Sequence, residues 1–313
     1  HTFLIEYITS ITTSMNNLIL ALLICGLMSS CEALNFLEPF QNSATLGEVL
    51  RTESKLSYEK KYNQSYSEDP YQKYDLYLPK KDSSASENPT VSLVMVHGGG
   101  WNLLDKSYLN SVVYEFTKKG LNLAVFNINH RLADHDSTQF GGIMDDFHLF
   151  FKHHDSLKTN LGLSDRVILW GYSSGGHLAL SYAYKFSQYD IDAVIAVAAP
   201  TDLTDKAIHQ GIFDDKNRNL TELLIGHPYD ENPEAYKDAS PYFMVHKQNP
   251  VTLLFYGGND ILVDKSQGQK LNEALRDNKI QSEFRLVFEA THDFDNKMGE
   301  ITDEAIRLLE DVK

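Results

Sequence analysis

A short glycine-rich turn near the middle of the chain holds a serine that could act as a nucleophile. Residues 171–175 read GYSSG; they follow an apolar, strand-forming run and precede a helix-compatible apolar segment. In the pattern G-x-S-x-G, a tight strand-to-helix turn needs both glycines, because a Cβ at either position would collide with a neighbouring strand or helix. The turn would lift the Oγ of Ser173 clear of its surroundings. It would also direct the N–H of Ser174, at the positive end of the helix, into the same space. The alternative is an ordinary glycine- and serine-rich loop, so the nucleophile interpretation needs support from elsewhere in the chain.

A second glycine-rich stretch could stabilise the negative charge that such a serine creates. Residues 97–101 read HGGGW and directly follow the continuous apolar run 91–96. Successive glycines let backbone N–H groups approach a ligand without obstruction by side chains. The N–H groups of Gly99, Gly100 and Ser174 therefore form a predicted oxyanion hole for a tetrahedral intermediate. The alternative is a plain glycine-rich turn.

Two further groups could activate the serine: a histidine that takes its proton and an aspartate that orients the histidine. Asp260 comes directly after the apolar run 251–256, where its carboxylate could accept the Nδ1–H of a histidine and fix the tautomer. Asp264 competes for this role, but it lies further along, toward the next helix. His292 follows the last apolar run, and an imidazole with an unperturbed pKa of about 6.5 can take the serine proton and return it to the leaving group. The sequence therefore predicts a catalytic triad of Ser173, Asp260 and His292.

Alternating strand and helix patterns place these residues at one edge of a sheet. Continuous apolar runs are typical of strands buried on both faces, and apolar spacing of 3.6 residues is typical of amphipathic helices. The predicted strands are 91–96, 121–128, 167–170, 193–198, 251–256 and 284–288, and the predicted helices are 107–119, 142–157, 266–278 and 301–312. Alternation at 56–62 and 71–78 predicts an antiparallel hairpin with one solvated face. We therefore expect an α/β fold with a mostly parallel central sheet, helices on both faces and an antiparallel N-terminal edge. Its site should lie at the carboxyl ends of the strands.

Composition and charge exclude several classes of function. The chain has 313 residues, of which 42% are apolar, enough for one large domain. With 28 Lys and Arg against 43 Asp and Glu, the net charge of −15 disfavours nucleic acid or anionic lipid as a partner. The two cysteines, Cys25 and Cys31, precede the predicted domain. Catalysis by a thiol and a thiolate zinc site are therefore excluded for the domain.

Residues 1–34 have the character of an export signal that begins at Met15, the residues before it being a mis-assigned start or an added segment. An apolar run, 18–28, is too short to span a bilayer comfortably and is followed by small residues and Cys31. This ending resembles a bacterial lipoprotein box, in which the cysteine would carry the lipid. We expect an exported protein that is periplasmic, secreted, or anchored to the membrane only through a lipid on Cys31. The alternative is an unprocessed amphipathic or signal-anchor segment. A single α/β domain would then comprise 35–313.

Over residues 56–313 the chain resembles the α/β-hydrolases of the hormone-sensitive-lipase-like group, whose triad has the order serine, aspartate, histidine along the chain. It is most similar in pattern to the feruloyl/acetyl-xylan-esterase-like (BD-FAE-like) and kynurenine-formamidase-like branches. The shared motifs are 97–101 (HGGGW), 129–133 (NHRLA), 171–177 (GYSSGGH), 200–203 (PTDL), 240–241 (SP) and 258–260 (GND). Two positions depart from the family pattern: His130 stands where tyrosine is usual, and Ser174 stands where alanine is common.

The resemblance implies a serine hydrolase that needs no cofactor or metal and cleaves carboxylic esters of short to medium acyl chain through an acyl-enzyme. Its substrate would be a small-molecule or polysaccharide-linked ester, with Trp101 and Tyr172 as pocket residues; Trp101 is equally compatible with plain core. The insertion 203–242 is expected to form a small lid or pocket wall. The alternatives are a kynurenine-formamidase-like amide hydrolase and a non-catalytic hydrolase fold that binds at the cell surface. The sequence carries no signal for an oligomeric state.

The remaining polar residues near these motifs have structural interpretations. Arg131 is expected to pair with Asp145 or Asp146 and so to order its turn. His177, in the helix after the serine, is expected to pack in the interior. A cluster of histidines on one helix lacks the H-E-x-x-H pattern of a zinc site. Its members are His148, His153 and His154.

Overall fold

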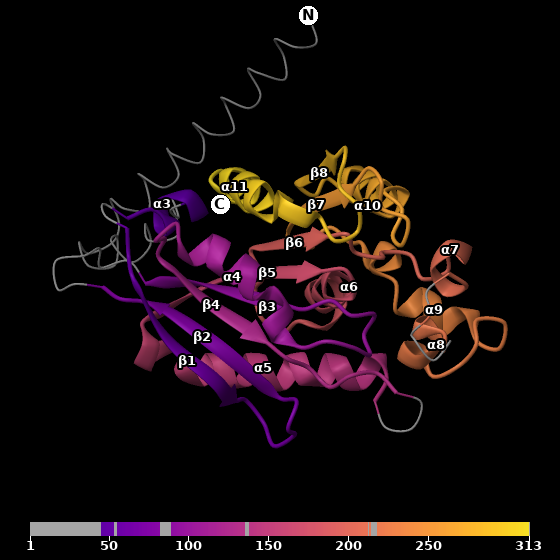
Figure 1. Ribbon diagram of the computed structural model, residues 1–313, viewed down its shortest axis with the longest axis horizontal. Coiled ribbons are helices and arrows are strands. Elements are labelled where there is room, and N and C mark those ends of the chain that lie inside the picture. The colour runs from indigo at the N-terminus through magenta and orange to yellow at the C-terminus, as the bar shows by residue number, and fades with distance from the viewer. Residues whose placement is uncertain are drawn as a thin grey trace, which may run out of the picture. The chain divides into compact units, whose positions relative to one another are not determined.

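Eight strands form one sheet that is mostly parallel. The structure is a computed structural model that describes residues 45–52, 55–81, 89–134, 138–211, 213 and 218–312, all within one compact unit, Thr45–Lys313. The strands are β1 (Tyr58–Ser65), β2 (Lys73–Pro79), β3 (Thr90–Val96), β4 (Leu123–Ile128), β5 (Leu163–Tyr172), β6 (Ala193–Val197), β7 (Val251–Gly257) and β8 (Ser282–Val287). Their order across the sheet is β1-β2-β4-β3-β5-β6-β7-β8 (Figure 1). Because β2 is antiparallel to both neighbours and the pairs from β4 to β8 are parallel, the predicted α/β fold with an antiparallel N-terminal edge is confirmed.

Helices cover both faces of this sheet. On one face pack α3 (Leu46–Leu50), α4 (Asn110–Thr117) and α11 (Met298–Leu309), and on the other pack α5 (Phe140–Leu161), α6 (Ser174–Ser181) and α10 (Ser266–Asp277). Three short helices, α7 (Lys206–His209), α8 (Leu220–Ile225) and α9 (Pro233–Asp238), follow β6 and lie beyond the carboxyl ends of the central strands in Figure 1. Single turns of other helix types are η2 (Lys106–Leu109), η3 (Tyr182–Phe186), η4 (Pro241–Met244) and η5 (Asp295–Lys297).

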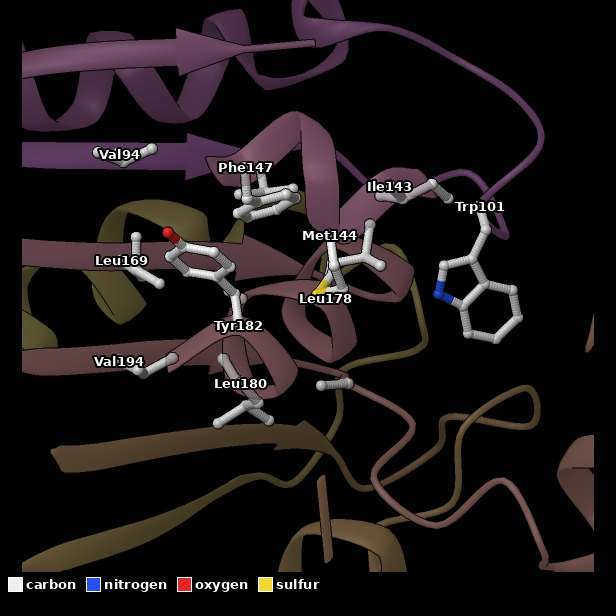
Figure 2. Close-up of a cluster of buried hydrophobic side chains, with 14 of the residues drawn as sticks. Val94, Trp101, Ile143, Met144, Phe147, Leu169, Leu178, Leu180, Tyr182 and Val194 are labelled. Atoms are coloured by element: carbon white, nitrogen blue, oxygen red, sulfur yellow. The ribbon is translucent and has the colours of Figure 1, made fainter. Parts of the chain in front are cut away.

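The central strands are buried on both faces, as their continuous apolar runs predict. Along β3, Val94 belongs to the apolar cluster beneath α5 and α6, whereas Leu93 and Met95 belong to the cluster beneath α4 and α11. Figure 2 shows the first cluster, in which Phe147 of α5 and Leu178 of α6 lie against the sheet. Successive side chains of a strand point to opposite faces, so a strand covered on both sides needs apolar residues at every position.

The N-terminal hairpin differs from its prediction of one buried and one solvated face. Beyond Tyr58 the residues of β1 are exposed on both faces, whereas β2 is buried at most positions of both faces. The reason is the place of each strand in the sheet. β1 is the edge strand, while β2 lies between β1 and β4 and contributes Leu76 to one apolar cluster and Tyr77 to the other.

Two predicted segments extend outside the described residues. The leader 1–34, with the lipid-accepting role of Cys31, lies there entirely and stays a prediction. Within the insertion 203–242, residues 212 and 214–217 also lie outside, and the remainder contains α7, α8 and α9. No helix in the described part of the chain combines the length and the apolar character that crossing a membrane would need.

Candidate active site

Ser173 occupies a strained turn between the end of β5 and the start of α6. Its backbone has φ 53° and ψ −123°, and its N–H donates to the carbonyl of Val197 in β6 at 2.7 Å. A positive φ is unfavourable for a residue with a side chain and persists where the surroundings enforce it. The flanking glycines are required as predicted: a Cβ on Gly171 would lie 2.3 Å from the carbonyl oxygen of Gly175, and a Cβ on Gly175 would lie 2.3 Å from that of Val96.

The structure brings the three predicted triad residues together. The Nε2 atom of His292 lies 2.9 Å from the Oγ of Ser173, and its Nδ1 lies 2.8 Å from the Oδ2 of Asp260. His292 follows β8, and the hydroxyl of Tyr172 donates to its backbone carbonyl at 2.6 Å. A carboxylate only accepts hydrogen bonds, so Nδ1 carries the proton and Nε2 is left to accept the serine proton.

The carboxylate that contacts His292 belongs to Asp260 and not to its competitor Asp264. Its side chain is fully enclosed, and its Oδ1 accepts the backbone N–H groups of Leu262 and Val263, each at 2.9 Å. These two bonds hold the carboxylate so that Oδ2 faces the imidazole. Asp264 instead accepts the N–H of Ser266 at 2.9 Å. Hydrogen bonding by the side chain and then the backbone of Ser266 lowers the pKa of Asp264.

The glycine-rich loop after β3 presents amide groups to the serine. Gly99, Gly100 and Trp101 have successive positive φ values of 111°, 57° and 64°. Within the described residues, no hydrogen bond uses the N–H of Gly99, Gly100 or Ser174, so all three remain available to an oxyanion. Close packing fixes the loop, because a Cβ on Gly99 would lie 2.1 Å from the carbonyl oxygen of Leu103.

A cavity of about 300 Å³ lies beside the catalytic serine and histidine and the glycine-rich loop. The predicted triad histidine and serine and the three predicted oxyanion residues line one part of it. Its remaining walls are mainly apolar and include Trp101, Leu104, Tyr108, Phe213, Leu220 and Leu262. The predicted pocket residues Trp101 and Tyr172 both contribute to the lining.

Trp101 is both a cavity wall and part of the interior, which resolves the alternative that the sequence leaves open. Its side chain is only 1% exposed, and its indole N–H donates to the Nδ1 of His177 at 3.0 Å. The Nε2–H of His177 in turn donates to the carbonyl of Ala239 at 2.7 Å. His177 is therefore a packing residue as predicted, and burial lowers its pKa to about 4.

Arg131 lies in a turn that contacts the glycine-rich loop, and its ion-pair partner is Asp146 rather than Asp145. The Nε of Arg131 donates to Asp146 Oδ1 at 2.8 Å, and its backbone N–H donates to Oδ2 at 2.7 Å. Two residues further along, the N–H of Ala133 donates to the carbonyl of Trp101 at 2.8 Å. The ion pair orders the turn at Arg131, and this turn contacts the glycine-rich loop through the hydrogen bond from Ala133 to Trp101.

Sequence reasoning missed a pair of buried histidines behind the same loop. The rings of His97 and His130 stack with centroids 4.6 Å apart, and the Nδ1–H of His97 donates to the carbonyl of Gly98 at 2.7 Å. This bond holds the peptide unit whose N–H belongs to Gly99. Burial lowers the pKa of His97 to about 3, so the ring is neutral. No local pattern could reveal the pair, because the two residues stand on different strand ends.

Two of the α5 histidines are hydrogen-bonded to side chains of the sheet. His154 pairs with the hydroxyl of Ser92 at 2.8 Å, and His153 pairs with that of Tyr74 at 3.1 Å. Over the part of the chain that the structure describes, no group of three or more His, Cys, Asp or Glu side chains is arranged to hold a metal ion.

Comparisons with known proteins identify the family to which this chain is similar. The model of the BD-FAE family matches residues 74–275. The esterase LipC of Mycobacterium tuberculosis is 24% identical over 236 residues, which cover 67% of this chain and 54% of LipC. The chain therefore spans about half of the length of that curated relative.

Two solved structures share the fold. A truncated carbohydrate esterase from gut microbiota has a TM-score of 0.67 and 20% identity, covering 83% of this chain and 99% of the other. Esterase B from Lactobacillus rhamnosis has a TM-score of 0.65 and 18% identity, covering 90% of each chain.

Proposed function

We propose that this chain, which belongs to the BD-FAE family, is a serine carboxylesterase that cleaves esters of short to medium acyl chain through an acyl-enzyme intermediate. The observation that carries the proposal is the continuous hydrogen-bonded series from Asp260 through His292 to Ser173. The relative LipC bears the name of an esterase, which favours ester hydrolysis over a formamidase-like or a purely binding role. Small-molecule or polysaccharide-linked esters are the proposed substrates.

In the acylation half-reaction, the Oγ of Ser173 attacks the ester carbonyl while the Nε2 of His292 takes the hydroxyl proton. Asp260 stabilises the imidazolium that forms, and the N–H groups of Gly99, Gly100 and Ser174 bind the oxyanion. The intermediate then collapses, the bond to the alcohol oxygen breaks, and His292 returns the proton to the departing alcohol.

Water completes the cycle in the second half-reaction. His292 takes a proton from a water molecule, whose oxygen attacks the acyl carbonyl. The same three N–H groups bind the oxyanion that forms. The bond to Ser173 breaks, the serine recovers its proton, and the carboxylic acid leaves. The net reaction consumes one ester and one water and releases one acid and one alcohol.

The size of the catalytic cavity supports short to medium acyl groups. A volume of about 300 Å³ is at the lower end of the range for small-molecule sites. The side chain of Leu220 from α8 closes in on the glycine-rich loop, since a Cβ on Gly100 would lie 2.3 Å from its Cδ1. The helix that carries Leu220 thus acts as the pocket wall expected of the insertion.

A fluorophosphonate probe tests the proposal directly. The wild-type protein should become covalently labelled, and Ser173→Ala should not. Ser181→Ala is the matched control, because this serine lies in the helix that follows Ser173 but is enclosed and outside the cavity lining; it should label normally. A series of p-nitrophenyl esters of rising chain length, run beside N-formylkynurenine, should show hydrolysis of the short esters. Labelling of Ser173→Ala, or turnover of the formamide alone, would contradict the proposal.

We further propose that residues 1–34 direct export, with lipid attachment at Cys31. The support is the apolar run 18–28 ahead of small residues and a cysteine. Mass spectrometry of protein from the native host should give a mature amino terminus at Cys31 carrying a lipid. An intact leader on protein recovered from the cytoplasm would contradict this.

A further inference from the structure

The lining of the catalytic cavity contains a single carboxylate, and the mechanism does not use it. Among the described residues that line the cavity, Asp293 is the only aspartate or glutamate, and none is a lysine or an arginine. Asp293 directly follows the triad histidine, and its side chain is exposed. Because the other walls are mainly apolar, this one charge acts with little competition on a ligand that binds beside it.

The protein offers this carboxylate no cationic partner. Within the described part of the chain, Asp293 forms no ion pair and its side chain accepts no hydrogen bond. Two aspartates that follow other lining residues along the chain behave differently. Asp105 accepts the N–H of Ser107 at 2.7 Å, and Asp264 accepts that of Ser266 at 2.9 Å. Those two carboxylates serve their own turns, whereas Asp293 is available to a ligand.

Contacts on both sides fix the place of Asp293. On one side, the hydroxyl of Tyr172 donates to the carbonyl of His292 at 2.6 Å. On the other side, Phe294 is fully buried, and its N–H donates to the carbonyl of Thr291 at 3.3 Å. The backbone of Asp293 is therefore held before a substrate binds, and its charge occupies a defined place at the cavity.

Aromatic rings lie beside the carboxylate. Tyr108 and Tyr172 both line the cavity, and their rings stack with centroids 5.8 Å apart. Burial raises the pKa of both phenols, and the nearby charge of Asp293 raises it further. Phe213 contributes another ring to the lining, and its side chain is 48% exposed. Aromatic faces attract cations within about 6 Å of the ring, so the rings and the carboxylate favour the same sign of charge.

The path of the proton determines which half of the ester meets Asp293. When the tetrahedral intermediate collapses, His292 donates its proton to the oxygen of the alcohol. The alcohol therefore leaves on the histidine side of the cavity, while the acyl group stays bound to Ser173. Because Asp293 is the neighbour of His292 and lines the same cavity, its carboxylate faces the alcohol half.

We propose that Asp293 is a specificity-determining residue that selects esters of cationic alcohols, in particular alcohols that carry an alkylammonium group. The inference rests on the proposed esterase function and adds the charge of the alcohol. An alkylammonium group combines a positive charge with an apolar body, which suits aromatic and apolar walls beside one carboxylate. The net charge of −15 acts in the same direction, since it attracts cations toward the protein and repels anions.

Two acetates of the same shape test the role of the charge. Acetylcholine and neohexyl acetate differ in one atom, nitrogen in the first and carbon in the second, and both give the same acetyl-enzyme. We define the selectivity ratio as kcat/KM for acetylcholine divided by kcat/KM for neohexyl acetate. Asp293→Asn removes the charge and keeps the size of the side chain, so it should lower the selectivity ratio about five-fold, the upper end for a partly exposed charge pair. A ratio cancels any general loss of folded protein, because one sample hydrolyses both esters.

Glu289→Gln is the matched control for this variant. Glu289 is an exposed carboxylate on the same segment between β8 and His292, but it does not line the cavity. Its removal should leave the selectivity ratio unchanged. An equal fall in the ratio would overturn the inference, because the charge of the protein as a whole would then be the cause.

A second pair of esters checks which half the carboxylate faces. The ethyl ester of glycine betaine and ethyl tert-butylacetate carry the same exchange of nitrogen for carbon in the acyl half. Asp293→Asn should change the ratio for this pair less than it changes the selectivity ratio. A larger change here would overturn the assignment to the alcohol half.

Inhibition of the wild-type protein provides a measurement that needs no variant. Choline should inhibit hydrolysis of p-nitrophenyl acetate more strongly than neohexyl alcohol does, and sodium chloride should reduce the difference because salt screens charges. Equal inhibition by the two alcohols, or an unchanged selectivity ratio in Asp293→Asn, would overturn the inference. Failure of the esterase proposal looks different: the wild type would hydrolyse none of these esters and would resist the fluorophosphonate.

Discussion

Replacing Asp260 by asparagine should disable the enzyme through the tautomer of His292, without removing a side chain. The Oδ1 of Asp260 accepts two backbone N–H groups, from Leu262 and Val263, and Oδ2 accepts the Nδ1–H of the imidazole. An asparagine has one oxygen and one NH₂ group for these two places. With the oxygen kept at the backbone amides, the NH₂ group faces Nδ1, which must then give up its proton. The proton moves to Nε2, and the imidazole can no longer accept the proton of Ser173.

The size of the loss follows from the free energy needed to turn the new asparagine amide over, so that its oxygen faces Nδ1 of His292. Turning the amide over would leave two enclosed N–H groups without an acceptor, at about 1–3 kcal/mol each. The total of about 2–6 kcal/mol makes the active orientation rarer by a factor between about 30 and 10⁴. A wrong tautomer in a triad of this kind costs about 10⁴ in kcat, which bounds the loss from above. We therefore expect Asp260→Asn to lower kcat/KM by between about 30-fold and 10⁴-fold at pH 7.

Hydrolysis of p-nitrophenyl acetate measures this loss, and urea unfolding checks that the fold survives. Asp264→Asn is the matched control, because Asp264 accepts a loop N–H and does not reach the imidazole. Its rate should stay within two-fold of wild type. If Asp260→Asn retains a third or more of the wild-type rate, or if Asp264→Asn suffers the larger loss, Asp260 does not set the tautomer of His292.

Three further changes probe the surroundings of the triad. Tyr172→Phe removes the hydroxyl that donates to the His292 carbonyl at 2.6 Å, a bond worth about 1 kcal/mol, and should lower kcat/KM about five-fold; an unchanged rate would show that the bond does not position the imidazole. Ser174→Ala and Ser181→Ala each remove an enclosed hydroxyl that has no partner in the described part of the chain, so urea unfolding should show a gain of up to about 1 kcal/mol. A loss of stability in either would mean that its hydroxyl is paired. Burial lowers the pKa of His177 to about 4. Below about pH 6.5, therefore, this imidazole binds a proton in the unfolded chain but not in the folded one. Stability should fall as the pH drops from 6.5 toward 4, by about 1.4 kcal/mol per pH unit from this group, and His177→Gln should lessen that slope; an equal slope in the variant would exclude His177 as its source.

The turn around Ser173 was predictable because its requirements are local. A strand, a strained residue and a close-packed helix must follow one another within a few residues, and only glycine fits where Gly171 and Gly175 approach backbone oxygens. The buried strands were predictable for a related reason, since a parallel strand covered on both faces leaves a continuous apolar run. The antiparallel hairpin was also predicted correctly, but the burial of its two strands was not. Alternation within a strand does not reveal whether that strand lies at the edge of the sheet or inside it.

The sequence favoured Asp260 by its place directly after a strand, but the contact that decides between the two carboxylates is visible only in the assembled fold. Asp260 and Asp264 are only four residues apart, and the choice depends on which of them faces a histidine that follows another strand. The dual role of Trp101 depends in the same way on His177, which arrives from α6. Contacts of this kind join residues that are distant along the chain, so local spacing carries no trace of them.

By itself, the sequence determined which groups are present for the chemistry, the order of the triad and the strand ends that carry it. For residues 1–34 it supports a prediction of export, which stays a prediction. Tertiary structure alone decided how those groups pair, which protonation pattern the imidazole adopts, and which residues line the cavity beside them. The physical reason is that hydrogen bonding and burial act over a few ångströms in space, whereas a sequence records only neighbours along the chain.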